Sequence, residues 1–350
     1  MLFTDVKPVV EATRGAVVES IHYGAITIVD VHGNIVASHG NPATVTFLRS
    51  TSKPFQALPF VEMGGPEHYG LTERELAIMC ASHIGTDEHV QVIESIQKKV
   101  GIREENLLCG THPPSHKPTR EAMLLRGEAP TPNRHNCSGK HSGFIAQALL
   151  RSLPIEDYIN PDHEIQKTIL KTFAEMCNIP PESVRLGIDG CSAPVFAVPL
   201  WNAAFAFARL CDPSGLSDTR AVACQKITHA MTSNPDMIAG PGEFDTLLMQ
   251  VGKGKIVSKR GAEGYQGIGL LPGAIESESP ALGITIKISD GDLDERARSV
   301  ATIEILHQLG VLSQEQIDQE LAKFATGPIY NWRKLKVGEL RPVFDLKLRG

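Results

Sequence analysis

Long apolar stretches are missing from this sequence. No run of about 18 apolar residues, the length of a membrane-spanning helix, occurs, and the first residues lack the apolar core of a secretory signal peptide. A long run of Lys and Arg is also missing, and the formal net charge is -6. Neither a membrane nor a nucleic acid is therefore an expected partner, and we expect a cytoplasmic protein that acts on a small molecule.

Several common site motifs are missing too. The seven cysteines are an odd number and none has C-x-x-C spacing, which indicates reduced, mostly buried thiols. Residues 136–143, NCSGKHSG, lack the first glycine and the final Ser or Thr of a phosphate-binding loop. Residues 264–273, GYQGIGLLPG, do not have the G-x-G-x-x-G spacing of a dinucleotide site. Both nucleotide-binding classes are thereby excluded.

The two ends of the chain have the pattern of β-strands. Residues 25–38, AITIVDVHGNIVAS, place two apolar runs on either side of Gly33 and Asn34, which predicts a hairpin. Three further strands are predicted near the other end, followed by a helix over 292–310. These strands are expected at residues 255–264, 266–274 and 282–292.

The middle of the chain has helical periodicity instead. Helices are expected at 54–64, 72–83, 87–101, 160–177 and 199–211. Between them, residues 109–143 are rich in Pro, His and Gly, and loops of this length usually carry function. We therefore predict an α+β fold: residues 1–49 and 254–350 form an antiparallel sheet lobe, and 50–253 form an inserted, mostly helical lobe.

The segment LRSTSKPFQALPF, residues 48–60, places Ser50 three positions before Lys53. Such residues share one face of a helix, and a desolvated lysine is able to take the proton of a serine and activate it as a nucleophile. The simpler interpretation is a helix-capping serine, either Ser50 or Ser52, beside a solvated amine. The motif alone does not decide between them.

Two other segments carry residues of the same kind. Ser82 and His83 follow an apolar helical stretch at a corner. Lys259 lies near the end of a predicted strand, before Gly261, where a ligand is able to approach the backbone closely. Each has a simpler explanation, which is a turn serine in the first case and a protective edge-strand lysine in the second.

Cysteines stand at two corners bounded by glycine. Cys137 is followed by Lys140 and His141, and Cys191 lies in IDGCSAP, residues 188–194. Two thiolates completed by nitrogen ligands suit Zn²⁺, and spacing alone favours His141 as the nitrogen ligand. Two buried free cysteines are the alternative.

Taken in order, Ser-x-x-Lys, Ser and a late Lys-x-Gly resemble the serine β-lactamases and penicillin-binding proteins. Within that fold the sequence resembles the L-asparaginase II family, the Rhizobium-etli-type asparaginases. The motifs that carry this resemblance span about residues 49 to 270: RSTSKPFQALP, ASHIGTDEH, CGTHPP, NCSGKHSG, DGCSAP, NPDMIAGPGEFDT and KRGAEGYQGIGL.

The resemblance implies a catalytic set, a metal site and a homodimer. The implied catalytic residues are Ser50, Lys53, Ser82 and Lys259. The implied Zn²⁺ ligands are Cys137, Lys140 and Cys191, so that the lysine replaces His141 in that role. The implied substrate contacts are Arg49, His141, Asp189, Gly261 and Glu263. The chain departs from the family at Arg260, where a hydroxyl residue is commoner.

The implied reaction is hydrolysis of L-asparagine to L-aspartate and ammonia through an acyl-enzyme. Ser50 is the expected nucleophile because Lys53 is close to it in the chain. A serine glutaminase, or an amidase for another carboxamide, would use the same residues. A non-catalytic protein that binds an amino acid or zinc is the alternative from a different class.

Overall fold

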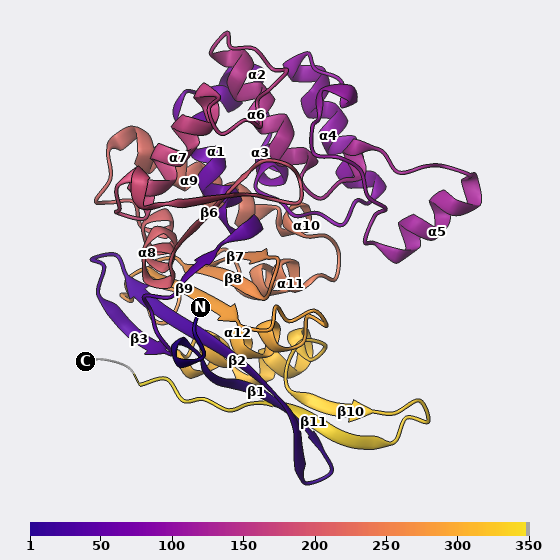
Figure 1. Ribbon diagram of the computed structural model, residues 1–350, viewed down its shortest axis with the longest axis vertical. Helices are drawn as coiled ribbons and strands as arrows, with labels where there is room; N and C mark the ends of the chain where they lie inside the picture. The colour runs from indigo at the N-terminus through magenta and orange to yellow at the C-terminus, as the bar shows by residue number, and fades with distance from the viewer. Residues whose placement is uncertain (348–350) are drawn as a thin grey trace. The chain divides into compact units, whose positions relative to one another are not determined.

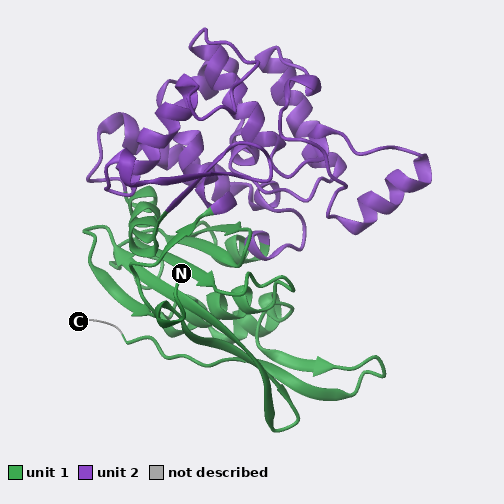
Figure 2. Ribbon diagram, in the orientation of Figure 1, with its two compact units in different colours: residues 1–48, 198–212, 247–350 green, residues 49–197, 213–246 purple. Residues whose placement is uncertain are grey.

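The computed structural model describes residues 1–347, and these form an α+β fold in which helices accompany antiparallel strands, as predicted. The chain divides into two compact units (Figure 2). Unit 1 contains residues 1–48, 198–212 and the chain from 247 onward, and unit 2 contains residues 49–197 and 213–246. The segment 198–212, which we expected in the helical lobe, thus clusters with the sheet.

Unit 1 is built on an eight-stranded sheet with the order β10-β11-β1-β2-β9-β8-β7, in which β3 also pairs with β2. Adjacent strands run antiparallel. The strands are β1 (Lys7–Arg14), β2 (Val17–Asp30), β3 (Ile35–His39), β7 (Ile256–Gly261), β8 (Tyr265–Leu270), β9 (Leu282–Ile288), β10 (Gly327–Tyr330) and β11 (Lys336–Pro342). The short β4 (Val45–Phe47) follows β3 in the chain.

The first hairpin forms where the sequence predicts it, between β2 and β3. Gly33 has φ 85°, a left-handed conformation that glycine adopts without strain, and the Asp30 carboxylate accepts the backbone N–H groups of His32 and Asn34. The hairpin of β10 and β11 was not predicted. Its strands are only partly buried, so no apolar alternation marks them in the sequence.

Two long helices pack on this sheet (Figure 1). α8 (Leu200–Cys211) lies against β2, β8 and β9, and α12 (Ala297–Gln308) packs on β1, β8, β9 and β11. Gly283 allows the close approach of α8, because a Cβ there would stand 1.7 Å from the carbonyl oxygen of Ala204. The remaining helices here are the short α13 (Gln314–Gln316) and α11 (Phe244–Val251), which begins in unit 2.

Unit 2 is mainly helical, and its helices are α1 (Lys53–Glu62), α2 (Gly65–Tyr69), α3 (Glu73–Met79), α4 (Asp87–Val100), α5 (Lys117–Arg126), α6 (Ser138–Leu150), α7 (Glu164–Met176), α9 (Asp218–Ser233) and α10 (Pro235–Ile238). It also contains the antiparallel pair β5 (Arg185–Ile188) and β6 (Pro194–Pro199). The end of β6, from residue 198 onward, belongs to unit 1. Across residues 1–347, no helix is both long and apolar enough to cross a bilayer.

Capping explains where several of these helices begin and end. Thr72 starts α3 with a capping box, since its hydroxyl accepts the N–H of Glu75 while the Glu75 carboxylate accepts the N–H of Thr72. Gly101 ends α4 in a left-handed conformation. Pro54 stands in the first turn of α1, where proline is tolerated. The pair β5 and β6 was missed because these strands are short and lie inside a segment of helical periodicity.

Candidate active site

Lys53 is a buried polar residue at the start of α1. It begins α1 directly after a 3₁₀ turn over Arg49–Ser52, and its side chain is 1% exposed. The amine Nζ donates to Ser82 Oγ at 3.0 Å, to the carbonyl oxygen of Asn136 at 3.2 Å and to the carbonyl oxygen of Ala81. These acceptors come from the corner after α3 and from the loop before α6.

These three acceptors determine which way the lone pair of a neutral Lys53 amine points. An ammonium group has three donors, and each has an acceptor here. A neutral amine has two N–H donors and one lone pair, and a carbonyl oxygen only accepts. When Lys53 is neutral, the carbonyls of Ala81 and Asn136 therefore retain its two N–H groups, and the lone pair faces the Ser82 hydroxyl. The arrangement suits Lys53 to take a proton from Ser82.

Ser50 lies three residues before Lys53 but is not bonded to it. Among residues 1–347, the Ser50 hydroxyl forms no hydrogen bond. The residue before it, Arg49, has φ 53°, a strained conformation that is uncommon outside glycine and concentrates at functional sites. The helix N-cap is Ser52, whose hydroxyl donates to the Arg49 carbonyl at 2.9 Å. The nucleophilic role of Ser50 stays a prediction.

Arg49 and Asp189, both expected to contact substrate, form an ion pair with Nε 2.8 Å from Oδ1. Burial raises the pKa of Asp189, but the positive charges of Lys140 and Arg49 outweigh it and lower that pKa on balance. The carboxylate also accepts the N–H of Gly190 at 2.8 Å, which fixes the turn before Cys191. The pair is thus charged and held in place, as a group that binds the ends of an amino acid must be.

Cys137, Lys140 and Cys191 meet in the interior of unit 2. Each is at most 3% exposed, and the Lys140 amine lies 2.9 Å from Cys191 Sγ. A hydrogen bond from Cys191 and the charges of Lys53 and Lys140 lower the pKa of Cys137, although burial opposes them. The same hydrogen bond, together with burial, raises the pKa of Cys191. The thiol pair therefore loses its first proton readily and its second with difficulty.

These three side chains have the chemistry of a site for a borderline cation. Two sulfur donors and one amine suit Zn²⁺, which binds deprotonated ligands of this kind. Burial lowers the pKa of Lys140, but the negative charges of Cys191 and Cys137 outweigh it and raise that pKa, so the amine is an ammonium unless a cation displaces its proton. No group of three or more His, Cys, Asp or Glu side chains in residues 1–347 is arranged to hold a metal. Zinc binding stays a prediction.

His141 stands beside this cluster but faces a tyrosine. Its Nδ1 lies 2.7 Å from the hydroxyl of Tyr158, which also accepts the N–H of Leu108 at 2.7 Å. The Tyr158 hydroxyl therefore donates its proton to His141 Nδ1, which accepts, and Nε2 carries the imidazole proton. A protonated Nε2 is no metal ligand. Burial lowers the pKa of His141 to about 4, and interaction with Cys191 partly opposes this.

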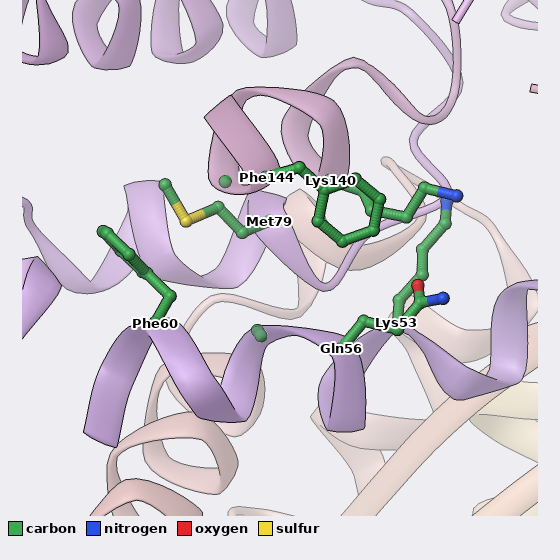
Figure 3. A pocket seen from close by; sticks show the side chains of 8 residues that line it. Lys53, Gln56, Phe60, Met79, Lys140 and Phe144 are labelled. Carbon is green, nitrogen blue, oxygen red and sulfur yellow. The ribbon is translucent and has the colours of Figure 1, made fainter. Parts of the chain in front are cut away.

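A small cavity lies between α1, α3 and α6, next to Lys53. The polar ends of Lys53, Gln56 and Lys140 gather at one end of it, and Phe60 and Met79 line the other (Figure 3). Its volume of about 10 Å³ holds one water molecule. This cavity is too small for an amino acid.

The other expected site residues lie in unit 1. Lys259 is fully buried on β7, and its amine donates to the carbonyl oxygen of Arg260 at 2.9 Å. Side chains alternate along a strand, so Arg260 points to the opposite sheet face, where its guanidinium lies 3.3 Å from a carboxylate oxygen of Glu295. The unusual Arg260 therefore does not share the face of Lys259.

Gly261 ends β7, and the next turn contains Glu263 with φ 61°. The amine of Lys287 donates to the Glu263 carbonyl. Substrate contact by Gly261 and Glu263, and a catalytic role for Lys259, stay predictions.

Sequence reasoning missed several polar residues of the site. Asn136 and His112 belong to the segment 109–143, whose length and composition marked it without indicating individual roles. We expected a loop there, but the segment contains the helix α5 and the first turns of α6. Cys109 is also there, a third buried thiol whose pKa burial and the nearby Cys137 and Cys191 raise to about 12. Tyr158 lies outside that segment, and nothing in its sequence surroundings indicated a bond to His141.

Comparison with solved structures finds glutaminases at low similarity. A probable glutaminase from Bacillus subtilis in complex with 6-diazo-5-oxo-L-norleucine has 12% identity and a TM-score of 0.39, with 82% of this chain and 84% of that chain covered. A Bacillus glutaminase in 4.3 M NaCl has 11% identity and a TM-score of 0.39, with 83% and 92% covered. These values are too low to assign a substrate.

Comparison with curated protein sequences finds no significant match. The sequence model of a protein family does match, and it spans both units. The match extends over residues 10–342 and is described as L-asparaginase II. It agrees with the motifs found in the sequence, and the chain belongs to the L-asparaginase II family of amidohydrolases.

Proposed function

We propose that the protein hydrolyses the side-chain amide of L-asparagine to L-aspartate and ammonia. The observation that carries this proposal is the buried Lys53 amine, which two carbonyl oxygens hold against the hydroxyl of Ser82. A base and a hydroxyl in such contact are the parts that serine-based amide hydrolysis requires. Membership of the L-asparaginase II family supports the same reaction.

In the proposed mechanism Ser50 Oγ attacks the amide carbon of the substrate. Ser82 accepts the proton of Ser50 and passes its own proton to the Lys53 amine. The same relay then runs in reverse and delivers the proton to the departing ammonia, which leaves Ser50 acylated. Water repeats the sequence on the acyl-enzyme and releases aspartate. Lys259 is proposed as a second source of positive charge for this relay.

Arg49 and Asp189 are proposed to bind the α-carboxylate and α-amino groups of the substrate. Their charges are opposite and each matches one end of an amino acid. Their mutual ion pair holds both side chains in place before the substrate arrives. His141, Gly261 and Glu263 are proposed as further contacts.

Zn²⁺ is proposed to bind Cys137, Cys191 and Lys140. The bound ion would supply positive charge that polarises and orients the substrate amide. Independently of it, Tyr158 orients His141, and the two thiols provide a soft donor pair. Metal content measured by mass spectrometry on the purified protein tests this site. Cys137→Ser and Cys191→Ser are expected to lose stoichiometric zinc, and Cys177→Ser, which alters a buried thiol that is not one of the proposed ligands, is expected to keep it.

The deciding experiment measures ammonia release from asparagine and glutamine by the wild type and by Ser50→Ala, with and without a chelator. We expect kcat/KM for asparagine to exceed that for glutamine by at least about tenfold, since one added methylene displaces the reacting carbon. Faster release from glutamine would identify a glutaminase. Binding of asparagine without ammonia release, unchanged in Ser50→Ala, would identify a non-catalytic binding protein. A cytoplasmic homodimer is also proposed, and light scattering measures the mass.

A further inference from the structure

Two histidines hold the turn that leads into α6. The N–H of Asn136 donates to Nε2 of His112 at 3.2 Å, and the N–H of Cys137 donates to Nδ1 of His135 at 3.0 Å. The centroids of the two imidazole rings are 4.4 Å apart. Consecutive backbone N–H groups thus end on a pair of packed imidazoles.

The protonation of His112 follows from its neighbours. Its Nδ1 lies 2.8 Å from the carbonyl oxygen of Pro113, which only accepts, so Nδ1 carries the proton. Its Nε2 then has a lone pair for the N–H of Asn136. The neutral ring therefore joins the loop at Pro113 to the turn at Asn136, and both of its nitrogens are used.

This link ends on the catalytic amine. Asn136 donates its N–H to His112 Nε2, and its carbonyl oxygen accepts a hydrogen bond from Lys53 Nζ. That carbonyl is one of the two that retain the N–H groups of a neutral Lys53 and leave its lone pair facing Ser82. If Asn136 rotates, the lone pair of Lys53 loses its fixed direction.

We propose that His112 is a positioning residue, which aims the Asn136 carbonyl at Lys53 and thereby directs the lysine lone pair to Ser82. The proposal rests on the amide hydrolysis proposed above, in which Lys53 is the base. His112 acts through Asn136, since the hydrogen bonds of its ring go to Pro113 and Asn136. When the Asn136 carbonyl is no longer oriented toward Lys53, proton transfer in the enzyme–substrate complex slows. The substitution should therefore lower kcat and leave KM nearly unchanged.

The test compares His112→Phe, His112→Asn and His112→Gln. The Gln amide reaches the position of imidazole Nε2 and restores an acceptor for Asn136, and the shorter Asn amide reaches only the position of Nδ1. We expect His112→Phe and His112→Asn to lower kcat about 10- to 100-fold with KM within about twofold, and His112→Gln to stay within about threefold of the wild type. His116→Phe is the matched control, because His116 is equally half-buried on the same loop but bonds Thr119.

Amide hydrogen exchange of the peptide that covers 135–138 gives a second readout, which does not depend on activity. We expect faster exchange in His112→Phe and His112→Asn, and wild-type exchange in His112→Gln and His116→Phe. Equal kcat in the Asn and Gln variants, or unchanged exchange in all of them, overturns the role of His112. If the wild type releases no ammonia from any amide while the exchange pattern holds, the proposed reaction fails and the positioning of Asn136 stands.

Discussion

The Lys53 amine lies 3.0 Å from the hydroxyl oxygen of Ser82, although these residues are 29 positions apart and Ser50 is only three positions away. The contact exists because α1 and the corner after α3 face the same interior, where the carbonyls of Ala81 and Asn136 fix the amine. Proximity in the chain suggested one serine partner for the lysine, and packing supplies another.

Replacement of this lysine by an uncharged side chain of similar length removes the base and keeps most of the packing. We expect Lys53→Met to lower kcat by about 10² to 10⁴-fold, which is the range of general base catalysis. We expect the melting temperature of this variant to stay close to that of the wild type, so that the loss of kcat reflects the missing base and not unfolding. Lys167→Met is the control, since Lys167 is exposed and pairs only with Glu164. Steady-state ammonia release measures both variants.

Covalent labelling distinguishes the roles of Ser50 and Ser82. A diazoketone analogue of asparagine alkylates the nucleophile of the active site, and intact-protein mass spectrometry detects the adduct. We expect Ser50→Ala to take up no label and Ser82→Ala to take it up slowly, because Ser82 passes on the proton. The opposite pattern would make Ser82 the nucleophile and leave Ser50 as its neighbour.

Two glycines of α6 provide a matched pair for packing. A Cβ on Gly139 would stand 2.1 Å from the carbonyl oxygen of Ile78, whereas one on Gly143 would stand 3.3 Å from the flexible sulfur of Met79. We expect Gly139→Ala to lower the free energy of unfolding by about 1–3 kcal/mol or more. Gly143→Ala is expected to change it by less than about 1 kcal/mol, since alanine favours helix. Urea unfolding measures both, and equal effects would contradict the tight contact.

Four buried histidines make stability depend on pH. Burial lowers the pKa values of His89, His135 and His141 to about 4, and that of His83 also falls well below its usual value. An unfolded histidine titrates near pH 6.5. Between about that pH and pH 4, the unfolded state therefore binds more protons at these histidines than the folded state does. The free energy of unfolding therefore falls as the pH falls from about 6.5 toward 4, by up to about 1.4 kcal/mol per pH unit for each histidine.

Urea unfolding between pH 7 and 5 measures this slope. His89→Gln is expected to reduce it by about one histidine's share, because glutamine does not titrate. His32→Gln, at an exposed histidine, is expected to leave the slope as it is. An unchanged slope in His89→Gln would contradict a lowered pKa of this ring in the folded state, because the ring would then take up protons equally in both states.

The hydroxyl of Tyr158 serves two partners in a fully buried position. Tyr158→Phe leaves the N–H of Leu108 without its acceptor and His141 Nδ1 without its donor. We expect a loss of about 1–3 kcal/mol in the free energy of unfolding. Tyr69→Phe is the control, as Tyr69 makes one long bond of 3.4 Å to the Ala146 carbonyl, and it is expected to cost less than about 1 kcal/mol. Thermal and urea unfolding should rank the two variants in this order.

Elements with strong local signals were predictable from the sequence. The hairpin around Gly33 and the helix that starts at Thr72 have turn or cap residues beside an apolar pattern, and local energetics decide both. The strands β5 and β10 carry no such signal. They are short, partly exposed, and formed by pairing with β6 and β11 rather than by their own periodicity.

The residues of the candidate site also divide into those that the sequence marked and those that only the fold revealed. The motif residues Cys137, Lys140 and Cys191 were identified from the sequence and do converge, though their distances came only with the fold. The link from His112 to Asn136 spans 24 positions, and it joins two irregular segments that stand on either side of the helix α5. No periodicity relates residues of two such irregular segments, so the tertiary fold alone decides which of their polar groups meet.

The distribution of the buried cysteines provides built-in reporters for the opening of each unit. All seven thiols are buried, and Cys211 is the one that belongs to unit 1. A thiol-specific reagent added under native conditions reacts only after local or global opening exposes the sulfur. The rate at which Cys211 is alkylated therefore times the opening of the sheet unit, and the other six thiols time the helical unit, within one sample and without any introduced probe.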